Sequence, residues 1–268
     1  QHGDVLVARD KLPEDLGLWH EVSATADTCL GSDCPRHAEC FVTRMPQRAA
    51  ESDVVIVNHH LLCADAAVRE SAYGEVIPSC PQLVIDEAHQ LEDVATQYFG
   101  RGVSNLRVDD LARDAEAALR AAASRARGAQ EAAREVMRVV DHARAFFSGL
   151  ALARMSRGDE RLRVAPAWFA DHLTTGLDLA GALDGLQATC ALAAAGREPG
   201  NDGAAVADDL TAVARRSGEM AGDLRFLLAC ADSSFVYFLE VKGRAVQLRA
   251  APIDVSRIVR DLVTGERR

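Results

Sequence analysis

Two adjacent carboxylates and a histidine directly follow an apolar run in this sequence. Leu83-Val84-Ile85 leads into Asp86, Glu87 and His89. An aspartate at the end of a buried strand can hold Mg²⁺, and a neighbouring glutamate can polarise the water that attacks a phosphate. Acids also suit the first turn of a helix, which is the plainer interpretation. The flanking residues 84–93 favour catalysis of ATP hydrolysis by Asp86 and Glu87, with His89 coupling the nucleotide to a second site.

A second group of chemically capable residues lies upstream. Cys29, Cys34 and Cys40 have the spacing C-x4-C-x5-C in a segment that also holds glycine and proline. Thiolates this close suit an iron–sulfur cluster or zinc, and both normally need four ligands. His37 would complete a zinc site; otherwise a fourth cysteine must come from outside this chain. The remaining cysteines stand in apolar or helical contexts and are expected to be buried thiols: Cys63, Cys80, Cys190 and Cys230.

The elements that must position the acidic pair are two short apolar runs. Residues 54–57 and 83–85 predict buried strands, and the helical pattern over 61–70 between them favours a parallel pair in an α/β sheet. Residues 44–52 predict a further short helix.

Residues 104–230 have a different character, because alanine, leucine and arginine dominate and apolar residues recur at helical spacing. This pattern predicts an all-helical insertion, with breaks near 158–159 and 197–203. Residues 235–239 and 245–250 predict a hairpin that turns near Lys242-Gly243-Arg244. A last helix is expected over 257–263.

Composition limits the function classes. The chain has 268 residues and a net charge of −10, which argues against coating nucleic acid through bulk charge but leaves room for a local basic groove. No apolar run long enough for a membrane span occurs. Seven cysteines without an export sequence favour a reducing compartment. Arginines recur every seven residues at 113, 120, 127 and 134, where interleaved acids favour a solvated face, and again at 154, 157, 161 and 163.

These features together resemble a known family. The segments 29–35 with Cys40-Phe41, 53–62, 86–93 followed by 97–100, and 251–256 are similar to the DinG/YoaA branch of the XPD-like superfamily 2 helicases. Residues 86–100 look most like the YoaA type. The resemblance implies a partial RecA-like parallel sheet with an iron–sulfur subdomain and a helical arch. On this basis we expect iron–sulfur residues at 1–46, motor domain 1 with the DEAH box at 47–103, the arch at 104–233 and a return to motor domain 1 at 234–268.

The resemblance also implies a function for the longer protein. It would be an ATP-dependent 5′–3′ DNA helicase of bacterial cytoplasm that acts in repair or replication, uses Mg²⁺, and takes single-stranded or forked DNA between cluster and arch. A replication protein would be a further partner. Cys29, Cys34 and Cys40 would be the last three ligands of a [4Fe–4S] cluster, and Asp86, Glu87 and His89 the magnesium, water-activating and coupling residues. Arg36, Arg44 and Arg48, beside the cluster, are the candidate DNA contacts.

One part of the machinery is missing from this sequence. No G-x-x-x-x-G-K-[ST] phosphate-binding loop occurs, and no second motor domain is present, so the chain alone is not expected to hydrolyse ATP. The alternative function class is a zinc-binding helical module that binds DNA or a protein through a Cys29, Cys34, His37 and Cys40 site.

Overall fold

The computed structural model describes residues 37–69, 77–79, 82–122, 129–155, 161–195 and 201–264. The chain divides into two compact units. Unit 1 combines Gln1–Tyr98 with Val255–Arg268, and unit 2 is Phe99–Asp254. Unit 2 is therefore an insertion in unit 1. It begins five residues before the expected arch at 104–233 and ends 21 residues after it.

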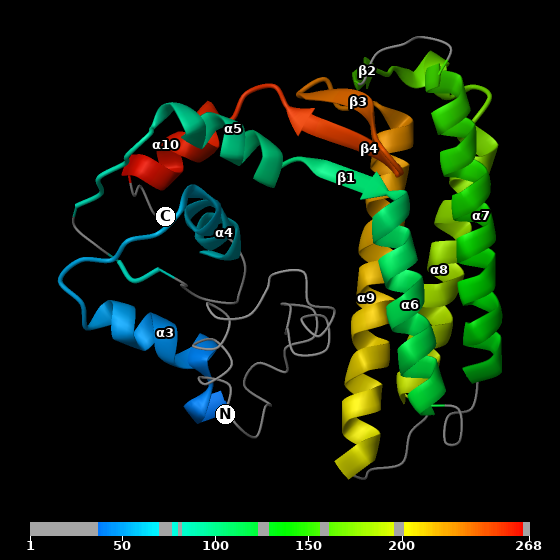
Figure 1. Cartoon of the computed structure of the whole chain (residues 1–268), viewed down its shortest axis with the longest axis horizontal. Coiled ribbons are helices and arrows are strands. Elements are labelled where there is room, and N and C mark those ends of the chain that lie inside the picture. Colours follow the sequence, from blue (N-terminus) through cyan, green and yellow to red (C-terminus); the bar gives the residue numbers. More distant parts are fainter. Residues whose placement is uncertain are drawn as a thin grey trace. The chain divides into compact units, whose positions relative to one another are not determined.

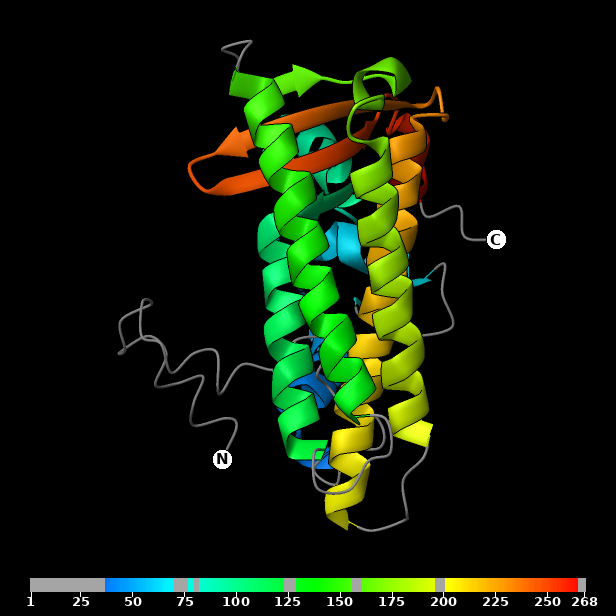
Figure 2. The same ribbon diagram turned by 90° about the vertical axis from the view of Figure 1, so that its right-hand side faces the viewer.

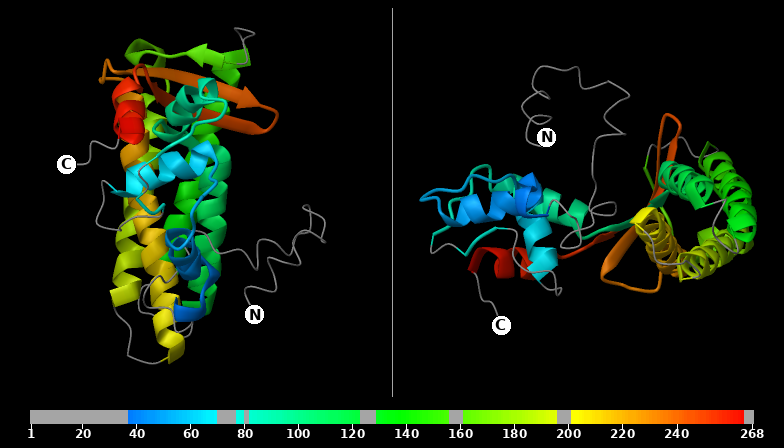
Figure 3. Two further views of the ribbon diagram at one scale, coloured as in Figure 1. Left: turned by 90° about the vertical axis from the view of Figure 1, so that its left-hand side faces the viewer. Right: turned by 90° about the horizontal axis from the view of Figure 1, so that it is seen from below.

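Four long helices form the body of unit 2: α6 (Asn105–Ala122), α7 (Ala129–Met155), α8 (Leu173–Ala195) and α9 (Asn201–Ala229). Each helix contacts the next and α9 also contacts α6, so the four close into a bundle, as Figures 2 and 3 show. One apolar stripe of α6 faces the core: Leu111, Ala115, Ala118, Leu119 and Ala122 are all buried. The prediction that helices dominate residues 104–230 is confirmed, although a short strand at Arg161–Arg163 interrupts them.

A four-stranded antiparallel sheet lies across one end of this bundle (Figure 1). Its strands are β1 (Arg101–Ser104), β2 (Arg161–Arg163), β3 (Phe235–Lys242) and β4 (Ala245–Pro252), in the order β1-β4-β3-β2. One face packs on the helices, where Leu239 and its cross-strand partner Leu248 are completely buried. A short 3₁₀ turn, η3 (Pro166–Phe169), connects β2 to α8.

The predicted hairpin is confirmed in position and turn. β3 and β4 pair over their full length from Phe235↔Pro252 to Lys242↔Ala245. Gly243 has φ +57°, a conformation that suits glycine and few other residues, and it closes the turn. In the sequence this hairpin was assigned to the return segment 234–268; in the structure it pairs with β1 at residues 101–104 inside unit 2.

Unit 1 contains short helices: η2 (His37–Glu39), α3 (Phe41–Ala50), α4 (His59–Arg69), α5 (His89–Tyr98) and α10 (Ser256–Thr264). Helix α10 contacts α5 and α4, although more than 150 residues separate them in sequence (Figure 1). The apolar residues Cys63, Leu91, Ala95 and Val255 are buried in this unit. The carboxylate of Asp65 is buried too, and it accepts a hydrogen bond from the backbone N–H of Ile77 (2.8 Å).

The parallel sheet expected in unit 1 is not found among the described residues. Residues 54–58 and 82–85, where the strands were expected, have no regular secondary structure. Val54, Ile56 and Val84 are 77%, 93% and 93% exposed, so these runs are not buried in this chain and the predicted parallel sheet is not confirmed. The physical reason is that a strand forms only when a neighbour satisfies its backbone N–H and C=O groups. Within the described part of the chain, neither run has such a neighbour. The observed fold is helical, with one small antiparallel sheet.

Among the described helices, none combines the length and apolar character that crossing a membrane requires.

Candidate functional site: the acidic turn before α5

The acidic pair lies on an exposed turn of residues 86–88 that leads directly into α5. The turn is closed by hydrogen bonds from the N–H of Gln90 to the carbonyl of Glu87 (2.8 Å) and from Leu91 to Ala88 (3.2 Å). Glu87 has φ +48°, which is unusual for a residue with a side chain and costs roughly 1 kcal/mol or more. The carboxylate of Asp86 supports this conformation by accepting the N–H of Glu87 (2.9 Å).

The side chains of the turn point to solvent, where an external ligand can reach them. Glu87 Oε2 lies 3.3 Å from Nδ1 of His89, and the two side chains are 59% and 75% exposed. This contact is a charged pair only when the imidazole is protonated. Neither carboxylate is buried, so a hydrated divalent cation can reach the oxygens of both side chains.

A second turn lies beside the acidic one. Asn58 Oδ1 accepts the N–H of Leu61 (2.8 Å) and so caps the start of α4. His59, the first residue of α4, donates from Nε2 to the backbone carbonyl of Asp86 (3.1 Å). This bond brings the first residue of α4 to the turn that opens α5. Helix starts carry partial positive charge, which favours a phosphate near them.

The sequence did not lead us to include Asn58 and His59 in the candidate site. The sequence places them directly after the apolar run 54–57, as Asp86 follows the run 83–85. If the two runs were neighbouring parallel strands, the residues that follow them would lie at the same edge of the sheet. This sequence pattern could have indicated that the two positions are close, and the hydrogen bond from His59 to Asp86 shows that they are.

The cysteine segment is described only at its end. Cys29, Cys34 and Arg36 lie outside the described residues. Cys40 is half-buried, is not in a disulfide, and stands at the residue before α3 with its N–H bonded to the carbonyl of His37 (3.2 Å). Within the part of the chain that the structure describes, no three His, Cys, Asp or Glu side chains gather closely enough to hold a metal ion.

Arg44 and Arg48, the DNA candidates of this region, are both exposed on α3. They follow Cys40 at intervals of four residues, so all three lie near one face of the helix. The structure thus brings the two arginines to the face that begins at Cys40.

The other described cysteines differ from Cys40. Cys63 and Cys190 are buried, and burial raises the pKa of both thiols, to about 11 for Cys190. Burial also raises the pKa of half-buried Cys230 to about 11, and its Sγ–H donates to the carbonyl of Leu227 (3.1 Å). A thiol that stays protonated at neutral pH is a poor ligand or nucleophile. These residues are structural, as their sequence contexts predicted.

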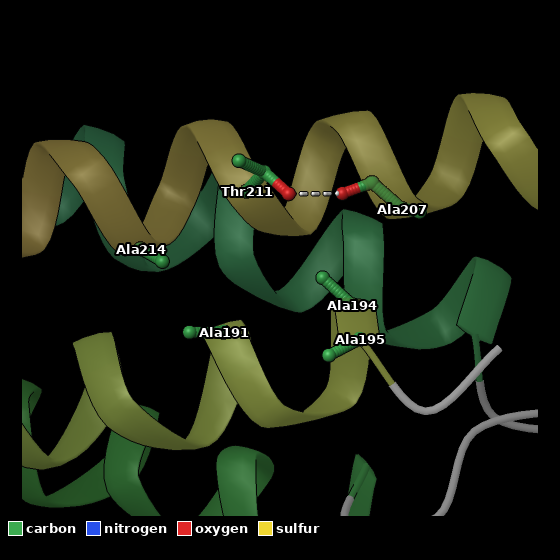
Figure 4. Close-up of a pocket in the computed structure, with 6 residues that line it drawn as sticks. All are labelled: Ala191, Ala194, Ala195, Ala207, Thr211 and Ala214. Atoms are coloured by element: carbon green, nitrogen blue, oxygen red, sulfur yellow. Dashed lines mark hydrogen bonds between the residues drawn. The ribbon is translucent and has the colours of Figure 1, made fainter.

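The surface between α8 and α9 holds a shallow pocket that lacks reactive groups (Figure 4). Its lining consists of five alanines and Thr211, whose hydroxyl donates to the carbonyl of Ala207 (2.8 Å). Without a titratable side chain this pocket offers no chemistry, so the acidic turn remains the candidate site.

Comparison with known proteins gives three informative matches. The chain is 50% identical over 107 residues to the ATP-dependent DNA helicase YoaA of Escherichia coli K12, covering 40% of this chain and 17% of that protein. It is 45% identical over 104 residues to YoaA of Haemophilus influenzae, covering 39% of this chain and 16% of that protein. It is 46% identical over 91 residues to the ATP-dependent helicase DinG of Mycobacterium tuberculosis H37Rv, covering 33% of this chain and 13% of that protein.

These matches confirm the resemblance to DinG/YoaA-type helicases over about two-fifths of the chain. No protein-family model matches the chain. The matched stretch is less than a fifth of the length of these relatives.

Proposed function

We propose that this chain, a partial homologue of the DinG/YoaA-type ATP-dependent DNA helicases, contributes the acidic half of an ATPase site to a longer DNA helicase. The single observation that carries the proposal is the turn 86–88, where two exposed carboxylates lie at the starts of α4 and α5 in a chain that matches these helicases at 45–50% identity over about two-fifths of its length.

The side chains of this turn have separable roles in the proposal. Asp86 holds the water shell of a magnesium ion, and Glu87 orients and polarises the water that attacks the terminal phosphate of ATP. The metal, when bound, neutralises charge on the phosphates. His89, at 3.3 Å from Glu87, senses the state of that carboxylate. His59 holds the backbone of Asp86 and thereby positions the turn.

The exposed apolar runs fit the same proposal. Val54, Ile56 and Val84 present apolar side chains to solvent just before the two turns of the site. A protein that exposes such runs gains free energy by covering them, at about 25 cal/mol for each Å² of apolar surface. We propose that 54–57 and 83–85 are strands of a RecA-like parallel sheet whose other strands belong to the rest of the longer protein.

The cysteine segment and the arginines beside it complete the proposal. Cys29, Cys34 and Cys40 hold a [4Fe–4S] cluster together with a cysteine from outside this chain. Arg44 and Arg48, with Arg36, contact the backbone of single-stranded or forked DNA that passes between the cluster region and unit 2, the arch. Translocation runs 5′ to 3′ during repair or replication in the bacterial cytoplasm, where a replication protein is a partner.

The experiment is Glu87→Gln in the longer protein that contains this chain. The amide keeps the size of the side chain but cannot polarise the attacking water, so we expect DNA-stimulated ATP hydrolysis to fall by about 10²-fold or more while nucleotide binding persists. Turnover is measured by phosphate release and binding by a fluorescent ATP analogue.

Glu92→Gln is the matched control, because Glu92 is an exposed glutamate in the first turn of the same helix. We expect it to retain turnover within about twofold, since it is outside the proposed site. Equal turnover in the Glu87 and Glu92 variants would exclude Glu87 as the water-activating residue.

A further inference from the structure

The face of the four-stranded sheet that is turned away from the bundle core carries an unusual set of side chains. Alternation along the strands divides the sheet cleanly, because Leu162, Leu239 and Leu248 lie on the inner face and are buried. The residues between them lie on the opposite face. This outer face carries Arg161 and Arg163 of β2, Phe238, Glu240 and Lys242 of β3, and Gln247 and Arg249 of β4.

Phe238 is the centre of the outer face. Arg163 and Arg249 are its direct cross-strand partners, one on each side. The guanidinium carbon of Arg161 lies 3.8 Å from the centroid of the Phe238 ring, and that of Arg249 lies 5.9 Å from it. The ring is only 5% exposed as a result. Cation–π contact of this kind holds a guanidinium in place while leaving N–H donors available.

Charge on the outer face is strongly one-sided. Its four cations face a single carboxylate, Glu240, which is paired with Lys242 at 3.0 Å. Among the described residues, neither Arg161 nor Arg163 has an acidic partner at ion-pair distance, and both are exposed. This concentration of positive charge occurs in a chain whose net charge is −10.

The arginines of the bundle helices contrast with this arrangement. Each of three exposed arginines pairs with an acid three residues earlier: Arg113 with Asp110, Arg138 with Glu135, and Arg144 with Asp141. Such pairs neutralise one another on a solvated face. Arg161 and Arg163 differ from these three helix arginines, and the structure adds Arg249 from β4 to the same face.

We propose that this outer face binds the phosphodiester backbone of single-stranded DNA. Guanidinium groups bind phosphate through paired N–H donors, and stacking on Phe238 orients one of them before the ligand arrives. Arg161 and Arg163 lie two residues apart on one strand, about 6.7 Å, a spacing suited to successive phosphates of an extended strand. The choice of DNA as the polyanion rests on the proposed function; the cationic face itself does not.

The test is fluorescence anisotropy of labelled oligo(dT) with the full 268-residue chain, at several salt concentrations and without ATP. The variant replaces Arg161, Arg163 and Arg249 with glutamine. If the three contact phosphates, the slope of log K against log salt falls in magnitude by about 2, and affinity at moderate salt falls about tenfold or more.

A second triple variant supplies the control for net charge. Glutamine at Arg113, Arg138 and Arg144 removes the same three charges from exposed helix positions, and we expect its affinity to stay within about twofold of the parent. Equal weakening in the two triple variants, or no binding by the parent chain, would overturn the proposal.

A third variant replaces Arg161, Arg163 and Arg249 with lysine. It keeps the three positive charges but removes the planar guanidinium donors, so it tests whether the guanidinium shape matters in a folded protein. We expect the lysine variant to keep most of the salt slope but to bind more weakly than the parent, with an unchanged circular dichroism spectrum. The DNA-binding measurement is independent of the ATPase test. If the glutamine variant lost DNA binding while Glu87→Gln kept normal ATP turnover, the DNA-binding surface would be supported and the proposed ATPase site would be excluded.

Discussion

Individual residues of the acidic turn differ from ordinary helix-starting acids in their backbone. Glu87 has positive φ and its carboxylate contacts His89, whereas an acid that only stabilises a helix start needs neither feature. Strained conformations persist where the surroundings hold them, and here Asp86 and His59 hold the turn. The geometry therefore favours the catalytic interpretation of the acids over the purely structural one.

Substitution of Cys40 tests the proposed iron–sulfur cluster. Cys40→Ser in the longer protein should lose bound iron and acid-labile sulfide, because Cys40 is a half-buried free thiol at the edge of the ligand segment. Cys190→Ala should retain both, because burial raises the pKa of Cys190 to about 11 and thiolate forms there only in alkali. Iron, sulfide and visible absorbance are measured. Stoichiometric zinc in the parent protein would instead support the zinc-binding alternative.

Helix α8 illustrates what packing demands of single positions in an element. At Gly176 an added Cβ would lie 2.8 Å from Leu228 Cδ1 and 3.0 Å from Phe146 Cε2, both in buried side chains. Gly181, one and a half turns later, has nothing within 4 Å of the same atom. Two glycines of one helix thus have opposite packing environments.

Alanine at these two positions should move stability in opposite directions. Gly181→Ala should stabilise the chain by about 0.5–1 kcal/mol through helix propensity alone. Gly176→Ala should lose about 1–3 kcal/mol to overpacking, which outweighs the gain in helix propensity, so the net change is destabilising. Thermal unfolding followed by circular dichroism measures both. A higher melting temperature for Gly176→Ala than for Gly181→Ala would contradict the close packing of α8 on α9.

The two units differ in how far their apolar side chains are buried. The continuous apolar core lies entirely within unit 2, from Val103 to Ala250. Its entry strand β1 and its exit strand β4 are paired neighbours, with Arg101 opposite Ala250. Unit 1 instead presents Val54, Ile56 and Val84 to solvent. Unit 2 thus has what a free-standing domain needs, since its own residues cover its apolar surface.

A fragment of residues 99–254 should therefore fold by itself. We expect a helical circular dichroism spectrum and one cooperative thermal transition, because the core and the sheet are complete within those residues. The matched test is a variant with Leu183 changed to alanine, a completely buried core position, which should lower the melting temperature of the fragment. A fragment without a cooperative transition would show that the bundle depends on unit 1.

The features that depend on local pattern were predictable before the fold was known: the long helices of 105–229, the β3–β4 hairpin, the helix at 256–264 and the acidic character of the turn 86–88. Helical periodicity and turn residues act over a few positions, so they are readable without the fold. Strand pairing is not local. The runs 54–57 and 83–85 look like strands in sequence, but they remain unpaired in the described chain because no neighbour satisfies their backbone groups.

Contacts between residues far apart in sequence became known from the three-dimensional structure. It placed His59 against the carbonyl of Asp86, and it paired β4 with β1, about 150 residues earlier in the chain. It also separated arginines that look alike in sequence. Arg113 and Arg138 on the helices pair with acids one turn away, while Arg161 and Arg163 of β2 lie against Phe238 of β3. The reason is that side-chain charge is set by composition, but its neutralisation depends on which elements the fold brings into contact.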